Sequence, residues 1–177
     1  MNRTKNIISD AFWQLLEEKP YNKITVQNIV ERCEVNRNTF YYYFRDIPDL
    51  AEYSIEAWAN EIIKNNSESG SPLKCVSILV QECTKRKNAF LRIYRSAHQE
   101  IFLQYLNKIS LDVVSIYVEI TTKDSDISPE DREVLIKYYK VMLTGGLLDW
   151  FDSGMSYDLL EFYKKISDSL EGPGRRP

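Results

Sequence analysis

The chain has 177 residues, a formal net charge of −3 at pH 7, and 44% hydrophobic residues. This length suits one domain of ordinary size or two small domains that share a core, and the hydrophobic content excludes a disordered chain. The slight negative charge argues against general polyanion binding, so any contact with nucleic acid has to come from locally placed side chains.

The first predicted helix covers residues 4–18, because Ile8, Ala11, Phe12 and Leu15 recur at the spacing of one helix face. The polar segment 19–23, which contains Pro20, ends this helix. Two short helices joined by a tight corner are predicted within residues 24–50.

Each of these two short helices has a suitable capping residue. Thr25 can accept a hydrogen bond from a first-turn amide of the first helix, and Asn36 can do the same for the second. Glu34 and Val35 lie between the helices and form the corner.

The second short helix combines a buried face with a polar and aromatic one. Phe40 and Phe44 are four residues apart and share the buried face, so residues 37, 38, 41 and 42 point elsewhere. Three consecutive tyrosines at residues 41–43 cannot share one narrow face, so at least one is expected to be exposed. This pattern matches helix-turn-helix geometry, in which the second helix enters a DNA major groove. The alternatives are a solvated, capped helix N-terminus and tyrosines that belong to the core.

This segment resembles the DNA-binding domain of the TetR family of bacterial transcriptional regulators. The resemblance is carried by ITV at residues 24–26, a short turn that ends at Val35, TFYYYF at residues 39–44, and Leu50 at the opening of a long fourth helix. Together with the first helix, it covers roughly the first third of the chain. It implies a three-helix DNA-binding head followed by a larger helical domain.

Two positions depart from the family's pattern. The family usually has glycine in the corner, where this chain has Glu34, and commonly has lysine at the start of the fourth helix, where this chain has Ile47. Both departures weaken the expected contact with phosphate, since one adds an acid and the other lacks a cation. Residues 1–50 hold seven basic and seven acidic side chains, although residues 36–45 hold two basic side chains and no acid.

The predicted DNA contacts lie mainly at the start and along one side of the second short helix. Arginine can fork onto guanine and asparagine onto adenine, because their donors and acceptors match those base edges in the major groove. The resemblance implies that Arg37 and Asn38 meet bases, and that matching positions around them meet phosphates or base edges. The full predicted set is Thr25, Asn36, Arg37, Asn38, Thr39, Tyr41, Tyr42 and Tyr43.

The rest of the chain predicts helices and no strand. The fourth helix ends near residue 65, and the polar segment 66–71 is the only clear linker inside the sequence. Further helices are predicted over residues 73–85, 88–97, 100–122, 129–152 and 157–170. The fold class is therefore all-α with about nine helices. It comprises a three-helix head (residues 1–48), a C-terminal helical domain for regulation and dimerisation (residues 49–171), and a loose tail (residues 172–177).

Paired glycines lie inside the predicted helix 129–152. Each glycine costs about 1 kcal/mol relative to alanine inside a helix, which makes sense where another helix passes very close. In the family the last two helices of each subunit build a dimer interface, and GGLLDWFDSG at residues 145–154 resembles a family pattern. Gly145, Gly146 and Trp150 are therefore predicted at a homodimer interface, with a kink or an intrachain contact as the alternative.

An effector pocket between the C-terminal helices is implied by the resemblance. Its predicted lining is Tyr94, His98, Tyr105, Tyr117 and Tyr139. The alternative is that these aromatics form plain core and that His98, the single histidine, is a surface or core residue. Nothing in the sequence names a ligand.

Metal, cofactor and catalytic sites are not predicted. The three cysteines have no framework spacing and suit a reducing compartment, and no His or Cys cluster has metal-ligand spacing. No apolar run is expected to span a membrane, and residues 1–10 lack a signal peptide's apolar core. The sequence thus predicts a cytoplasmic location and no membrane partner.

The functional hypothesis is a homodimeric DNA-binding transcriptional regulator, a ligand-responsive repressor acting on a palindromic operator. Its predicted partners are double-stranded DNA, a second copy of the chain and a small-molecule effector. An alternative keeps the fold but works through a protein partner, as an adaptor or co-activator. A small helical enzyme is the least favoured hypothesis, because the chain has one histidine and no Gly-rich phosphate loop.

Overall fold

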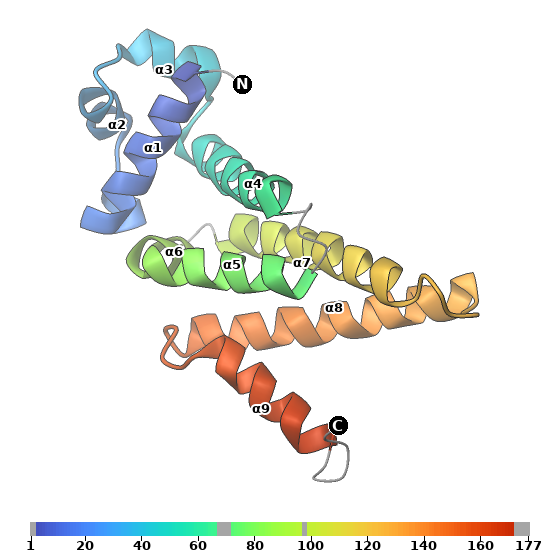
Figure 1. Ribbon diagram of the computed structural model, residues 1–177. Helices are drawn as coiled ribbons and strands as arrows, with labels where there is room; N and C mark the ends of the chain where they lie inside the picture. The colour runs from blue at the N-terminus through green and yellow to red at the C-terminus, as the bar shows by residue number, and fades with distance from the viewer. Residues whose placement is uncertain (1–2, 67–71, 97–98, 172–177) are drawn as a thin grey trace.

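A computed structural model describes residues 3–66, 72–96 and 99–171. Over these residues the chain forms nine α-helices and one short 3-10 helix, and no strand (Figure 1). The all-α prediction is therefore confirmed for the described part of the chain. His98, residues 67–71 of the predicted linker and the predicted tail at residues 172–177 lie outside the described residues.

The helix bounds follow the predicted ones to within a few residues. In chain order the elements are α1 (Arg3–Glu18), η1 (Tyr21–Lys23), α2 (Val26–Arg32), α3 (Arg37–Tyr43), α4 (Ile47–Asn66), α5 (Pro72–Lys85), α6 (Lys87–Tyr94), α7 (Gln99–Thr121), α8 (Pro129–Asp152) and α9 (Leu159–Glu171).

The head consists of α1, α2 and α3 packed around one apolar centre. Phe12, Leu16, Ile29 and Phe40 are all fully buried, so each of the three helices contributes its predicted apolar face. Figure 1 shows α3 at the outer end of the head, on the side away from α8 and α9.

The fourth helix starts earlier than Leu50. Asp46 caps it, since its Oδ1 accepts a hydrogen bond from the Asp49 amide at 2.8 Å, while Asp49 Oδ2 accepts one from the Arg45 amide at 2.8 Å. This reciprocal cap fixes the corner between α3 and α4. One buried contact between α4 and α1 is polar, where Ser9 Oγ donates to Ser54 Oγ at 2.8 Å.

The C-terminal helices are layered, with α5, α6 and α7 beside α4, and α8 and α9 on the far side (Figure 1). The long helices α7 and α8 pack along each other, and α7 also contacts α4, α5 and α6. By length and composition α7 could cross a membrane, which corrects the expectation that no segment could. One face of α7, which includes Phe102 and Val113, packs inside the helical domain, while Leu111, Ile116 and Ile120 on the same helix are exposed.

Contacts between the head and the C-terminal domain run through α1 and α6. The Trp13 ring lies 5.2 Å from the Phe90 ring, and the Arg86 guanidinium lies 5.5 Å from the Trp13 ring. Arg92 Nη1 donates a hydrogen bond of 2.6 Å to the carbonyl of Leu16, near the end of α1. These contacts belong to one apolar core that runs from the head into the C-terminal domain.

Candidate nucleic-acid interface

The first helix of the helix-turn-helix, α2, begins at a complete capping box. Thr25 Oγ1 accepts from the Asn28 amide at 3.2 Å, and Asn28 Oδ1 accepts from the Thr25 amide at 3.2 Å. The predicted cap at Thr25 is confirmed, and the reciprocal partner is an asparagine rather than the more usual glutamate or glutamine. Thr25 remains exposed at the edge of the head.

The corner after α2 contains a residue in the left-handed region. Glu34 has φ of 54°, and the Val35 amide donates to the Val30 carbonyl at 3.1 Å. This six-to-one bond, with a left-handed residue after the helix end, is the Schellman arrangement that favours glycine. The side chain of Glu34 is exposed, so the departure from the family's glycine places both strain and an acid at the corner.

The second helix, α3, begins at Asn36 as predicted. Asn36 Oδ1 accepts from the Thr39 amide at 2.7 Å and from Thr39 Oγ1 at 3.0 Å. Phe40 and Phe44 point into the core, with exposed fractions of 0% and 3%, which fixes the rotation of α3 about its axis. The opposite side of the helix therefore faces outward.

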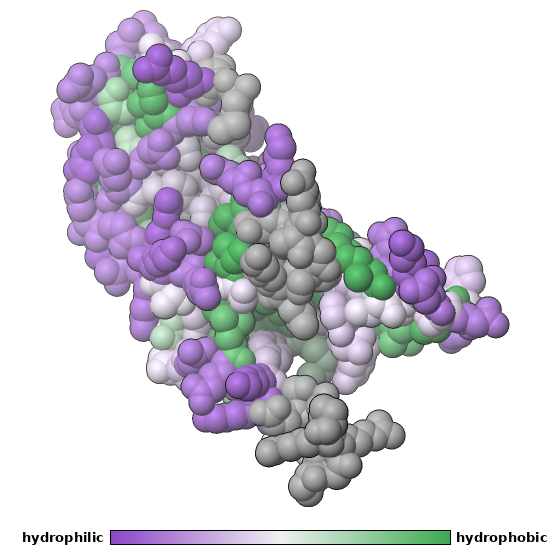
Figure 2. Space-filling model, in the orientation of Figure 1, coloured by the Kyte–Doolittle hydropathy of each residue, from purple (hydrophilic) through white to green (hydrophobic). Residues whose placement is uncertain are grey.

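The outward side of α3 carries the residues predicted to contact DNA. Arg37 and Asn38 are exposed, Tyr41 and Tyr42 are 48% and 81% exposed, and Tyr43 is half-buried. The prediction that at least one of the three tyrosines is exposed is confirmed. In the view of Figure 2 the surface of the head is mainly hydrophilic.

Arg37 is positioned by its neighbour one turn along. Its Nη2 donates to the Tyr41 hydroxyl at 3.4 Å, and its guanidinium lies 5.7 Å from the Tyr41 ring. An arginine held against an exposed ring keeps most of its donors available, and the planar guanidinium matches the two acceptors of guanine in the major groove. The arrangement is therefore suited to reading a base edge.

Two other cations lie near this surface and were not predicted as contacts. The Arg45 side chain is 82% exposed and lies 3.5 Å from Asp49 in an ion pair. Lys5 Nζ lies 5.5 Å from the Phe44 ring and 4.9 Å from the Tyr53 ring. The basic residues at positions 3, 5 and 45 can be read from the sequence. Only the fold shows that Lys5 lies close to Phe44, at the end of α3.

A third cation of the head is neutralised. Arg32 donates to both carboxylate oxygens of Glu18 at 2.7 Å each, and this hydrogen bonding lowers the pKa of Glu18 below its ordinary value. The bond joins the end of α1 to the end of α2. Arg32 therefore stabilises the head rather than adding to its positive charge.

The residues predicted at a dimer interface are not equivalent. Gly145 is exposed, and a Cβ added there would meet nothing within 4 Å. A Cβ at Gly146 would overlap Tyr163 Oη, so this glycine leaves room for α9 of the same chain, where Tyr163 donates to the Met142 carbonyl at 3.1 Å. For Gly146 the structure therefore supports the alternative, an intrachain contact.

Trp150 is also an intrachain residue, which corrects its assignment to the interface. Its side chain is 2% exposed, and its indole N–H donates to the Tyr157 carbonyl at 2.8 Å. A buried indole with its donor satisfied offers nothing to a second subunit. The sequence pattern around residues 145–150 marks the packing of α8 against the turn that leads to α9.

The four described residues that were predicted to line a pocket each make other contacts. Tyr94 is buried, and its hydroxyl donates to Asp152 at 2.5 Å. Burial, and to a lesser extent this hydrogen bond, raises the pKa of Tyr94 to about 12. Tyr105 donates to Glu52 at 3.1 Å near the surface. Tyr117 and Tyr139 stack edge to face, 5.5 Å apart, along the α7–α8 pair.

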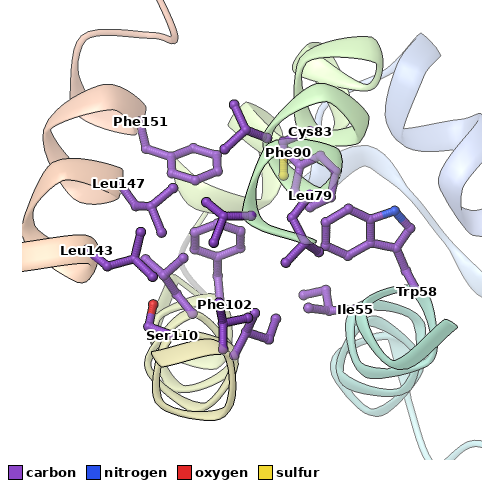
Figure 3. A pocket seen from close by; sticks show the side chains of 15 residues that line it. Ile55, Trp58, Leu79, Cys83, Phe90, Phe102, Ser110, Leu143, Leu147 and Phe151 are labelled. Atoms are coloured by element: carbon purple, nitrogen blue, oxygen red, sulfur yellow. The ribbon is translucent and has the colours of Figure 1, made fainter. Parts of the chain in front are cut away.

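A different cavity is present between α4, α5, α7 and α8 (Figure 3). Its volume is about 60 Å³. None of the four described tyrosines that were predicted to line a pocket borders it. Apart from Cys83 and Ser110, the described residues that line it have aliphatic and aromatic side chains. The lining comprises Ile55, Trp58, Val76, Leu79, Val80, Cys83, Phe90, Phe102, Leu106, Ile109, Ser110, Val113, Leu143, Leu147 and Phe151.

Comparison with protein families covers nearly the whole chain. Residues 8–53 match the family described as bacterial regulatory proteins, tetR family, and residues 71–172 match the family described as a transcriptional regulator C-terminal region. The first match contains α2 and α3, and the second contains α5 to α9.

One curated relative matches about a third of the chain. It is the HTH-type dhaKLM operon transcriptional activator DhaS of Lactococcus lactis subsp. lactis (strain IL1403), with 34% identity over 65 residues. The match covers 37% of this chain and 35% of that protein, so it spans about a third of the relative's length.

Two solved structures share the whole fold. The dihydroxyacetone kinase operon activator DhaS superposes with a TM-score of 0.79 and 20% identity, over 95% of this chain and 94% of that chain. The fatty acid degradation regulator FadR from Bacillus halodurans superposes with a TM-score of 0.64 and 18% identity, over 100% and 99%. At these identities the likeness concerns the fold alone.

Proposed function

The chain belongs to the TetR family of bacterial transcriptional regulators, and from this premise we propose that it is a cytoplasmic, sequence-specific DNA-binding repressor that acts as a homodimer. The family is a class of regulators and not of enzymes. In the proposal α3 enters the major groove, Arg37 and Asn38 meet base edges, and Thr25, Asn36, Thr39 and the tyrosines at residues 41–43 meet phosphates or base edges.

The observation that carries the proposal is the outward side of α3. Its two buried phenylalanines leave Arg37 and Asn38 exposed at the helix start, while the cap at Asn36 holds the first turn. The exposed N-terminal amides of α3 and the phenols beside them are suited to phosphate oxygens. No acid occurs among residues 36–45, so this surface is locally basic although the head is neutral.

Homodimerisation is supported by apolar side chains that the single chain leaves exposed. On α8, Val134, Tyr138 and Val141 recur at i, i+4 and i+7, and on α9 Phe162 and Ile166 are four residues apart; all five are 36% to 64% exposed. Gly145 continues the α8 stripe and leaves space for a side chain from a second copy. A two-fold pair of heads would read two half-sites, which gives more specificity than one.

Response to a small molecule is the remaining part of the proposal. A ligand that prefers one arrangement of the C-terminal domain would shift the spacing of the two heads and thereby the affinity for DNA. The contacts between α1 and α6 give such a shift a route to the head. A ligand that leaves operator affinity unchanged in a titration would contradict this part.

Selection of bound duplexes from a random pool tests the core of the proposal. We expect a palindrome with half-sites about 10 bp apart, or a multiple of this spacing. Light scattering of the protein alone should give twice the mass of the chain, and Val141→Glu should give a monomer that selects no palindrome. A pool without sequence enrichment would contradict the proposal.

The alternative function is an adaptor or activator that works through a protein partner. It is favoured by the neutral head, by Glu34 and Ile47 in place of the family's usual residues, and by the two comparisons in which DhaS is described as an activator. The salt dependence of DNA binding separates the two functions. Weak binding with a shallow slope favours the adaptor, and tight binding with a steep slope favours the repressor.

A further inference from the structure

A groove runs between η1 of the head and α6 of the C-terminal domain. Its volume is about 460 Å³, which falls within the roughly 300–1,000 Å³ of small-molecule sites. Figure 1 shows α6 against the end of α1, where the chain leads into η1. The described residues that line the groove are Pro20, Tyr21, Asn22, Asn88, Leu91, Arg92, Arg95 and Ser96, and none of them borders the apolar cavity.

The charged groups in the described lining of the groove are both positive. Arg92 lies in the last turn of α6, and Arg95 is the residue that caps this helix. Because they are three residues apart, both side chains project from one side of the helix. No aspartate or glutamate occurs in the described lining. Two guanidinium groups without a counter-charge in a concave surface favour an anion.

Neither arginine is neutralised within the described part of the chain. Five other basic side chains there form ion pairs, as Arg32 does with Glu18, but none of these pairs includes Arg92 or Arg95. The whole chain carries a net charge of −3, so acids are not scarce. The groove is therefore a local positive site in an acidic protein.

The two arginines are positioned in different ways. Arg92 is half-buried, and its Nη1 donates to the Leu16 carbonyl at 2.6 Å, which fixes the guanidinium beside the end of α1 and leaves its other donors available. Arg95 is exposed, and its Nη2 lies 3.1 Å from the place that a Cβ on Gly154 would take. One guanidinium is thus held before a ligand binds, and the other lies at the solvent side of the groove.

The remaining lining is suited to a compact apolar body. Pro20, Leu91 and the ring of Tyr21 supply apolar surface, and the amides of Asn22 and Asn88 supply further hydrogen-bonding groups. Small-molecule sites commonly combine apolar walls with a few placed polar groups. The groove therefore has both the charge and the surface that an organic anion requires.

We propose that this groove binds a small organic anion, whose carboxylate or phosphate group bonds to Arg92 and Arg95 and whose apolar body packs on Leu91. The planar guanidinium matches the paired oxygens of either group. Figure 1 shows α3 at the opposite end of the head from α6, so the anion is not a phosphate of the DNA that α3 would read. The proposal goes beyond the proposed function and rests on it only for an effect on DNA affinity.

A bound anion would connect the head to the C-terminal domain. One wall of the groove is Asn22 and its neighbours in the head, and the other wall is α6. Arg92 already joins the two parts through the Leu16 carbonyl. An anion between Arg92 and Asn22 would therefore stabilise one arrangement of the head against α6, and a ligand that prefers one arrangement shifts the population toward it.

The test titrates the full chain, without DNA, with phenyl phosphate, benzoate and inorganic phosphate, and with benzyl alcohol as the uncharged counterpart, all at pH 7 and constant ionic strength. Calorimetry gives the affinity, and thermal unfolding gives the stabilisation of the native state.

Four variants are compared in this titration. Arg95→Gln removes the exposed cation, and Arg92→Lys keeps a charge that can bond to the Leu16 carbonyl but removes the planar fork. Asn88→Phe fills the groove from an exposed position of α6. Lys123→Gln removes one exposed positive charge outside the groove and is the control.

We expect phenyl phosphate and benzoate to bind and benzyl alcohol not to bind. Phenyl phosphate should bind more tightly than inorganic phosphate, because its ring is removed from water in the groove. Arg95→Gln and Arg92→Lys should each weaken anion binding about tenfold, the loss of one charge-assisted hydrogen bond. Asn88→Phe should abolish binding, and Lys123→Gln should leave it unchanged. The affinity of phenyl phosphate relative to benzoate then identifies the preferred anionic group.

Three outcomes would overturn the proposal. They are the absence of binding by all three anions, binding of benzyl alcohol as tight as that of benzoate, and anion binding that is unchanged in both arginine variants or in a folded Asn88→Phe protein. The proposed function is tested separately by selection of DNA with the untreated chain. A chain that selects a palindrome but binds no anion overturns the groove proposal alone, and a chain that binds anions at the groove but selects no DNA overturns the proposed function alone.

Discussion

In the head, α2 and α3 begin at side chains that lie three residues from the amides they cap, Thr25 and Asn36. In the C-terminal domain, some side-chain contacts join residues far apart in the chain, such as Tyr94 with Asp152 and Lys108 with Glu56. The outward surface of the head is thus set mainly by local interactions. The interior of the C-terminal domain depends on which helix packs against which.

The two regions share one motif at a helix end, and different residues form it. Both α2 and α8 end in a Schellman arrangement, with the six-to-one bond from Val35 to Val30 in the head and from Met155 to Trp150 in the C-terminal domain. After α8 the left-handed residues are Gly154, with φ of 72°, and Met155, with φ of 52°; after α2 the left-handed residue is Glu34, with φ of 54°. Each region therefore places one non-glycine residue in the left-handed region at this turn, Glu34 in the head and Met155 in the C-terminal domain.

The largest effect is expected where the head's core meets its recognition helix. Phe40→Ala removes a fully buried ring and should lower the free energy of unfolding by about 3–5 kcal/mol. Tyr42→Ala, two residues along and 81% exposed, should change it by less than about 0.5 kcal/mol. Urea unfolding measures both. Similar losses for the two variants would mean that α3 is not oriented as described.

The paired glycines of α8 give a matched comparison inside the C-terminal domain. Gly146→Ala places a methyl against the Tyr163 hydroxyl and should destabilise the fold by about 1–3 kcal/mol. Gly145→Ala meets nothing in the chain and should stabilise the isolated subunit by up to about 1 kcal/mol. Thermal unfolding distinguishes the signs. The double variant Gly146→Ala with Tyr163→Phe should recover part of the loss, and no recovery would argue against this contact.

The same difference between regions explains what could be predicted from the sequence. The helix-turn-helix was predictable because caps, apolar spacing and the corner are all signalled within a few residues. For α8, the expectation that a helix passes close to Gly146 was right, but the helix is α9 of the same chain. Sequence spacing shows that space is needed, and it cannot show whether the neighbour belongs to the same subunit.

The lining of the cavity could not be predicted from the sequence, because residue type alone suggested tyrosines. Tyrosines looked suitable, yet each of the described ones uses its hydroxyl or ring in other contacts, as Tyr94 does with Asp152. The actual cavity is lined by ordinary core residues such as Leu79 and Phe102, which nothing in the sequence separates from plain core. Ser110 was the available signal, since a serine amid apolar positions of a buried helix face requires an explanation.

Base reading by α3 is tested by a pair of arginine variants. Arg37→Ala should cost about 1–3 kcal/mol on the selected operator and relax the preference at one base position. Arg45→Ala removes an exposed cation that is suited to a phosphate contact. It should weaken binding to all sequences alike and lower the salt slope by about 1. Titrations on operator and random duplexes measure both. An equal loss on random DNA for Arg37→Ala would rule out base reading.

A smaller effect is expected at the strained corner. Glu34→Gly relieves the left-handed strain and removes an acid, so it should stabilise the head by about 1 kcal/mol and tighten DNA binding. Glu34→Ala removes the acid but keeps the strain, so it should tighten binding with little gain in stability. Unfolding and DNA titration of the two variants separate strain from charge. If Glu34→Gly gives no more stability than Glu34→Ala, the corner is not strained as its backbone angle implies.

The smallest effect concerns the ion pair between Glu18 and Arg32, which joins α1 to α2 at the surface. The bond to Arg32 lowers the pKa of Glu18 below 4.5, so its stabilisation is present at neutral pH and is lost as pH falls through that lowered pKa. Glu18→Gln should therefore lower the urea midpoint slightly at pH 7, and this difference should disappear as the pH falls through the lowered pKa of Glu18. Glu17→Gln, its neighbour, controls for the loss of one charge. Since an exposed pair is screened by salt, the difference should also shrink in 1 M NaCl. A difference independent of pH and salt would mean that this ion pair does not help to hold α1 against α2.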